Sequence, residues 1–253
     1  MKQSSLNSLI ETIKNQYQKL EDFFTKGSFG VIFYPILMHP CVRHSHSFVV
    51  KIFAILSIFI GLYFLFAELI TILFSDASLS AYLSHTIFEL AQPQGTMIDE
   101  KVVFNSPLSF VIRASFLTQG YLFALIYWFA VMRVTHGIRL ITGLLAVLIS
   151  CGMALIYSAQ GGKWTVGGLQ NLGVSITFLL GNLMLIITAF TIKASDLSLF
   201  KRFSFIAGSL GLTAILVSLF QPTEYLSLLE RTSLYSLLLW EIAAGFAILK
   251  QVK

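Results

Sequence analysis

The chain has 253 residues, of which 56% are hydrophobic and only 11% are charged, and its formal net charge is +5. Soluble domains carry about 25% charged residues, so a soluble chain of this composition would expose apolar surface that it cannot cover. The basic residues are dispersed between apolar runs, which argues against a nucleic-acid partner. Two cysteines are too few for a disulfide framework.

The first predicted element is an amphipathic helix over residues 5–24. Its apolar face carries Leu6, Leu9, Ile10, Ile13, Tyr17, Leu20, Phe23 and Phe24 at helical spacing. We expect residues 1–48 to form a separate segment that lies in the cytoplasmic membrane interface. The alternative is that it packs on its own spans, on a second copy of the chain or on another membrane protein. The His and Cys residues between His39 and His46 fit no zinc spacing, so no metal or cofactor is expected.

Six apolar runs follow, and each reaches or approaches the ~20 residues that an α-helix needs to cross a bilayer. They cover residues 52–74, 109–132, 138–157, 173–192, 203–220 and 232–249. The predicted fold is therefore an all-α membrane protein. It has a six-transmembrane-helix bundle within residues 49–250, an N-terminal amphipathic helix and a structured outer loop over residues 75–108.

The distribution of Lys and Arg sets the expected orientation. Thirteen of the seventeen lie in residues 1–51, in the second and fourth loops and in the C-terminal tail, and the other four are Lys101, Arg113, Lys163 and Arg231. Cytoplasmic segments retain an excess of Lys and Arg. We therefore expect a multi-pass protein of the bacterial cytoplasmic (inner) membrane with both termini in the cytoplasm.

The outer loop 75–108 contains a predicted short helix over residues 80–91. His85 and Glu89 are four residues apart and so lie on one face of that helix, and Pro93 follows as a stop signal. A His with a carboxylate can relay a proton or act as an acid/base pair. The alternative is a short helix over the outer mouth of the bundle whose polar pair faces water.

A few polar residues fall inside the predicted spans, where ionisable groups are costly and usually functional. Glu68 and Arg113 lie at similar depth, so we expect a buried ion pair between them. We expect Gln119, Asn182 and Glu241 to share a layer near mid-bilayer, each ~14–15 Å from the outer surface. That layer can bind a polar headgroup or a proton, or it can simply clasp helices together. Glu230 and Arg231 stand where the sixth span begins on the outer side.

Three sequence segments resemble a known bacterial family. They are residues 83–90 (LSHTIFEL), residues 168–173 with 178–182 (GLQNLG and FLLGN), and residues 230–236 with 240–241 (ERTSLYS and WE). In this order they resemble the six-span family catalogued as domain of unknown function 998, over about residues 50–250. Phe88 and Gln170 depart from that family's pattern of Ser and His. The resemblance implies the six-span fold and carries no settled activity.

Three functions remain open from the sequence. The first is a membrane protein that binds or carries a lipid or small amphiphile through the polar layer. The second is an intramembrane enzyme that uses His85, Glu89 and Glu241 as acid/base groups. The third is a regulatory or immunity-type partner of another membrane protein. Motifs of hydrolases, nucleotide-binding loops and intramembrane metal sites are missing from the sequence, which favours a protein that is not an enzyme.

Overall fold

The structure is a computed structural model that divides into two compact units, Met1–Phe48 and Val49–Lys253. It describes residues 8, 11–12, 15–16, 18–19, 22–23, 26–27, 31–32, 35, 47–92, 94, 97–98, 101–102, 106–136, 139–158, 169–192, 194–220 and 225–252. In the first unit the described residues up to 26 are helical, and Lys26 pairs with Asp22 at 2.8 Å. Apart from Phe23, the apolar face predicted over residues 5–24 lies outside the described residues, as does the segment His39–His46.

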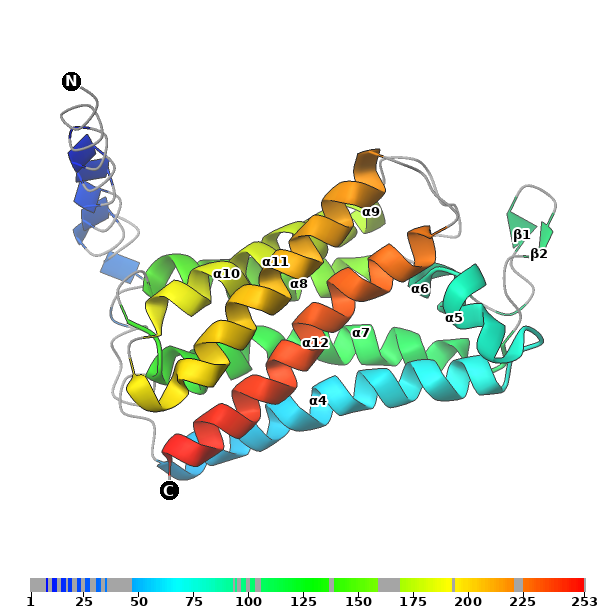
Figure 1. Cartoon of the computed structure of the whole chain (residues 1–253), viewed down its shortest axis with the longest axis horizontal. Coiled ribbons are helices and arrows are strands. Elements are labelled where there is room, and N and C mark those ends of the chain that lie inside the picture. Colours follow the sequence, from blue (N-terminus) through cyan, green and yellow to red (C-terminus); the bar gives the residue numbers. More distant parts are fainter. Residues whose placement is uncertain are drawn as a thin grey trace. The chain divides into compact units, whose positions relative to one another are not determined.

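The second unit is a helical bundle (Figure 1). Within the described ranges, five helical stretches have the length and apolar composition to cross a membrane, and a shorter apolar stretch covers Ile141–Tyr157. The chain is therefore a multi-pass helical membrane protein. The long helices are α4 (Ser47–Leu73), α7 (Ser109–Phe129), α8 (Arg139–Ser158), α9 (Leu169–Ser175) continuing into α10 (Gly181–Thr191), α11 (Ser198–Phe220) and α12 (Leu226–Gln251).

Short elements complete the unit. They are η1 (Ser78–Ser80), α5 (Ala81–Ser84), α6 (Ile87–Leu90), the antiparallel pair β1 (Met97–Ile98) and β2 (Lys101–Val102), η2 (Val131–Arg133), a wide π turn, η3 (Ile176–Leu180), between α9 and α10, and η4 (Ser195–Leu197).

The outer surface of the bundle is apolar. On α4, Ile55, Phe59 and Phe66 are 57–59% exposed, and on α11 Leu210 and Phe220 are 58% and 82% exposed. A protein in water covers apolar surface of this extent, whereas hydrocarbon accepts it without cost. These exposed rows therefore identify the lipid-facing sides of the helices.

α4 and α12 pack antiparallel along a seam of small residues. A Cβ atom added to Gly245 would lie 2.4 Å from the backbone oxygen of Ala54, and one added to Gly61 would lie 3.0 Å from that of Leu238. Small residues let helix backbones approach closely in a membrane, where tight packing replaces the hydrophobic effect as the driving force. Both contacts follow one register, in which each step of seven residues along α4 matches a step of seven back along α12. The next step places Glu68 opposite residue 231.

One end of the bundle is closed by α5 and α6, which we call the cap (Ala81–Leu90) (Figure 1). Ile87, Phe88 and Leu90 of the cap are 0–8% exposed. The Phe88 ring lies 6.5 Å from that of Phe116 and 5.8 Å from that of Phe178. The apolar side chains therefore insert the cap between the helix ends. The single helix predicted over residues 80–91 is wrong in one respect, because the chain is extended between α5 and α6.

The seam makes a direct prediction about stability. Gly245→Ala places a methyl group against the backbone of α4, which cannot rotate away, so the free energy of unfolding should fall by about 1–3 kcal/mol. The matched control is Phe246→Ala, because Phe246 is 61% exposed on the lipid side. Unfolding in mixed micelles measures both variants. Equal stability of Gly245→Ala and the unmodified chain would contradict the close seam.

Candidate functional site

Arg231 is the centre of the polar contacts at the cap. Its side chain is 3% exposed, and its Nε donates to Glu68 Oε1 at 2.8 Å. Its Nη1 donates to the backbone oxygens of His85 at 2.7 Å and Ser227 at 3.3 Å. The other carboxylate oxygen of Glu68 accepts a hydrogen bond of 2.6 Å from the Tyr235 hydroxyl. Arg231 therefore holds the cap, α4 and α12 together.

The buried ion pair predicted between Glu68 and Arg113 is wrong, since Glu68 pairs with Arg231. The prediction failed because the apolar run 232–249 suggested a span that begins after Arg231, whereas α12 begins at Leu226. Glu230 and Arg231 therefore lie inside the helix, more than one turn from its start. A signal was present in the sequence: Ala54, Gly61 and Glu68 are spaced by seven residues, as are Arg231, Leu238 and Gly245.

Further contacts hold the cap on α12. The Ser227 hydroxyl donates to the backbone oxygen of Leu83, and the Arg231 guanidinium lies 5.4 Å from the centre of the Tyr82 ring, a cation–π arrangement. Burial and the nearby Glu68 carboxylate raise the pKa of Tyr82, against a smaller lowering by Arg231. The phenol therefore stays neutral at physiological pH, as an aromatic partner of Arg231.

His85 and Glu89, predicted to share one face of a continuous helix, meet instead across the extended break between α5 and α6. His85 Nδ1 lies 2.9 Å from Glu89 Oε2, and the two side chains are 26% and 34% exposed. Glu89 also closes a capping box with Thr86: Glu89 Oε2 accepts from the Thr86 backbone nitrogen, and the Thr86 hydroxyl accepts from that of Glu89. The Glu89 carboxylate therefore caps the N-terminus of α6 and also orients the His85 imidazole.

Three charged side chains at this end of the bundle have a buried atom that no described residue binds. The atoms are Arg113 Nε, Glu230 Oε2 and Arg231 Nη2. Tyr157 interacts electrostatically with both Arg113 and Glu230, and Glu230 interacts with both Arg231 and Glu89. These electrostatic interactions, with the His85–Glu89 contact, define one group of residues, the cap-end cluster: His85, Glu89, Arg113, Tyr157, Glu230 and Arg231.

The expected polar layer divides into two separate pairs. Gln119 Nε2 donates to Glu241 Oε2 at 2.8 Å, and each side chain is 1% exposed, so these two members of the expected layer do lie at one level. Asn182 binds Ser233 instead, at 2.9 Å from its hydroxyl and 3.2 Å from its backbone oxygen. Ser233 precedes Glu241 by eight residues, about 12 Å along a helix. A single layer of Gln119, Asn182 and Glu241 is therefore wrong.

Asn182 has a structural reason for its place. The helix widens to a π turn over Ile176–Leu180, which disturbs the regular backbone hydrogen bonds. Asn182 Nδ2 donates to the Phe178 backbone oxygen at 2.8 Å and so adds a side-chain donor to an oxygen of that turn, which also accepts from the Gly181 N–H. Gly211 of α11 leaves room for the amide, since a Cβ there would lie 2.0 Å from Asn182 Oδ1.

The acid/base trio His85, Glu89 and Glu241 is not assembled either. Glu241 follows Arg231 by ten residues, about 15 Å along α12, while the His85 backbone contacts Arg231 directly. Glu230 takes its place near Glu89 in the cap-end cluster.

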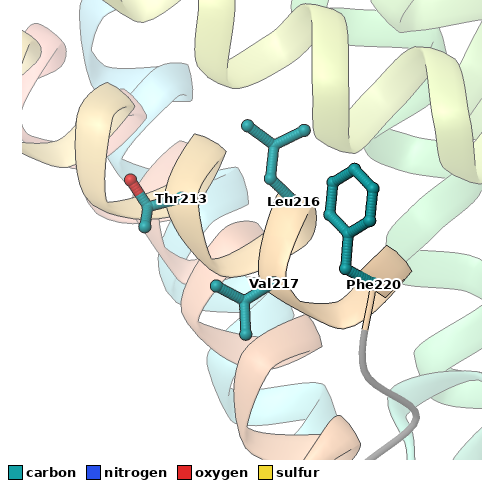
Figure 2. A pocket seen from close by; sticks show the side chains of 4 residues that line it. All are labelled: Thr213, Leu216, Val217 and Phe220. Atoms are coloured by element: carbon teal, nitrogen blue, oxygen red, sulfur yellow. The ribbon is translucent and has the colours of Figure 1, made fainter.

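A shallow groove on α11 lacks the chemistry of a site. Figure 2 shows Thr213, Leu216, Val217 and Phe220 along it, all from the same helix. The Thr213 hydroxyl donates within its own helix, to the Ser209 backbone oxygen at 2.8 Å. We therefore assign this groove to the lipid-facing surface. Among the described residues, three or more His, Cys, Asp or Glu side chains do not come together to hold a metal ion.

Because the Glu68–Arg231 pair is buried, removal of either partner should have a large effect on stability. Glu68→Gln or Arg231→Met alone leaves one uncompensated charge in a dry site, and each should lower the free energy of unfolding by about 3–5 kcal/mol. The double variant removes both charges and should lose less than either single variant. Arg202→Met, at an exposed position, is the control. If the double variant loses as much free energy of unfolding as the two single variants together, the pair is not formed.

Comparison of the chain with protein-family models, with curated proteins and with solved structures finds no match. The resemblance of the three short sequence segments to a six-span family stays a prediction. The contacts described above are therefore the basis for a function.

Proposed function

We propose that the chain is a six-span protein of the bacterial cytoplasmic membrane that binds the headgroup of a lipid or small amphiphile at the cap-end cluster. Besides the five long apolar stretches, we count α8 as a span, since its 20 residues reach about 30 Å, the thickness of the hydrocarbon core. Six spans return the C-terminus to the side of the N-terminus. The excess of Lys and Arg at both termini assigns that side to the cytoplasm and the cap to the outer face.

The observation that carries the ligand proposal is the set of unbound charged atoms at the cap. An unpaired buried hydrogen-bonding group costs ~1–3 kcal/mol, and a charged one costs more. Arg113, Glu230 and Arg231 each hold such an atom at the same end of the bundle. Gln119, Asn182 and Glu241 also keep one unbound buried oxygen each, but all three of these atoms are acceptors. An anionic headgroup needs donors, which Arg113 and Arg231 supply, and this favours the cap-end cluster over the polar layer as the binding site.

The chemistry of these atoms indicates the class of headgroup. The two guanidinium N–H groups are donors and suit an anionic oxygen such as that of a phosphate. The Glu230 oxygen is an acceptor and suits an ammonium or hydroxyl group. A zwitterionic headgroup with a phosphate and a primary amine supplies both partners. His85 and Glu89 remain partly exposed, which gives the polar group a path from water, while the acyl chains stay in the surrounding hydrocarbon.

A second function is favoured by the His85–Glu89 contact. A carboxylate that orients an imidazole, with a further carboxyl group on Glu230 in electrostatic range, is the composition of an acid/base site. In that case the bound amphiphile would be a substrate. A role as a regulatory partner, or self-association through residues 1–48, rests on a segment that is mostly outside the described residues.

The topology is tested by cysteine labelling in intact cells. In a background with Cys41→Ser and Cys151→Ser, Met97→Cys lies near the cap and should react with a membrane-impermeant maleimide. Gln251→Cys, at the end of α12, should react only after the cells are opened. The reverse pattern would contradict the orientation, and labelling of both from outside would contradict an even number of spans.

Ligand binding is tested by native mass spectrometry of the purified protein titrated with phosphatidylethanolamine. Arg113→Gln removes one unbound guanidinium and should weaken binding about 10-fold, as expected for the loss of one charged hydrogen bond of ~1.5 kcal/mol. Glu230→Gln should reduce the preference for phosphatidylethanolamine over phosphatidylcholine, whose ammonium has no N–H. The matched control Arg202→Gln changes an exposed arginine of α11 and should bind as the unmodified chain does.

Two results would decide against this site. Equal affinity of Arg113→Gln and Arg202→Gln would mean that the cluster does not hold the headgroup. Chemical conversion of the added lipid, lost in Glu89→Gln, would instead favour the acid/base function.

A further inference from the structure

The contact between Gln119 and Glu241 leaves two buried acceptor oxygens without a hydrogen-bond donor. Gln119 Nε2 donates to Glu241 Oε2 at 2.8 Å. The remaining oxygens, Glu241 Oε1 and Gln119 Oε1, are both fully buried, and no described group donates to either of them. An ionised carboxylate and an amide oxygen both accept hydrogen bonds and cannot donate to one another. The two remaining oxygens of the pair are therefore buried acceptors without a donor.

Within the described part of the chain, no cationic side chain binds the two unpaired oxygens. Arg231 is about 15 Å away along α12 and is bound to Glu68. The neighbouring polar side chains from α4 and α7 are Ser57, which donates to the Glu241 backbone oxygen at 2.7 Å, and Gln119 itself. Neither of them ionises. Among the groups that titrate, none interacts electrostatically with Glu241 within the described ranges.

We propose that the Gln119–Glu241 pair is a proton-binding site. A proton taken from water onto Oε1 turns the carboxylate into a neutral carboxylic acid, and its O–H then donates to Gln119 Oε1. The acid and the amide are joined by two hydrogen bonds in a ring, in which each side chain donates once and accepts once. One proton satisfies both orphaned oxygens and removes a charge that the hydrocarbon would disfavour.

Loss of that proton would act on the contact between α7 and α12. The ring opens, a full charge remains at 1% exposure, and the free carboxylate oxygen and the Gln119 carbonyl oxygen are both left without a donor. The Ser57 hydroxyl of α4 binds the backbone oxygen of the same residue, a bond that the proton does not change, so the protonation state of Glu241 acts on the contact between α7 and α12. This inference is independent of the headgroup site at the cap.

Infrared spectroscopy of the purified full-length protein tests the proposal, with the proton itself as the probe. At neutral pH the unmodified chain should show the C=O band of a hydrogen-bonded protonated carboxylic acid. The band should be absent from Glu241→Gln and retained in the matched variant Glu89→Gln, whose carboxyl group is 34% exposed. An amide at position 241 supplies one donor and one acceptor, so Glu241→Gln keeps a two-bond ring and should fold.

A second variant keeps the test decisive if Glu241→Gln does not fold. Gln119→Leu removes the acceptor of the acid proton, so the C=O band should persist and move to higher wavenumber. A spectrum in which Glu241 contributes a carboxylate band at neutral pH, or in which the acid band is unchanged by both variants, would overturn the proposal.

Discussion

The antiparallel register of α4 on α12 is the constraint on which the rest of the structure depends. Gly61 and Gly245 allow the two backbones to touch, and the same seven-residue step brings Glu68 to Arg231. A shift of one residue would lose all of these contacts together, because small residues would no longer face backbone and the two charges would separate in hydrocarbon. The ion pair therefore specifies the register, and the close seam makes the site dry enough for the pair to matter.

The remaining polar groups follow from that fixed pair. Arg231 has donors left over after binding Glu68, and they reach the backbone of the cap at His85. The cap is consequently held over one end of the bundle, where it closes the group that includes Arg113 and Glu230. Deeper in the bundle, Gln119 and Glu241 satisfy each other in part, since hydrocarbon offers no other partner. Unbound atoms on charged side chains therefore lie at the cap end, on Arg113, Glu230 and Arg231, and also on Glu241 inside the bundle.

The sequence was sufficient for features that depend on local pattern. Apolar runs located the long helices, and depth counting placed Gln119 and Glu241 at one level, where they meet. It was insufficient where partners come from distant segments. Depth alone could not choose between Arg113 and Arg231 as the partner of Glu68, because helix rotation and the start of α12 decide which side chain faces inward. Asn182 was likewise assigned to a layer by depth, whereas it satisfies the wide turn at Phe178.

An experimental density map of the protein in lipid nanodiscs that contain phosphatidylethanolamine tests the central claim most directly. That claim is that the α4–α12 register pairs Arg231 with Glu68 and leaves Arg113 and Glu230 to a ligand. The map should show Arg231 on Glu68 and headgroup density in contact with both Arg113 and Glu230. A map in which Arg113 and Glu230 bind each other directly, with no density between the cap and the helix ends, would contradict the account.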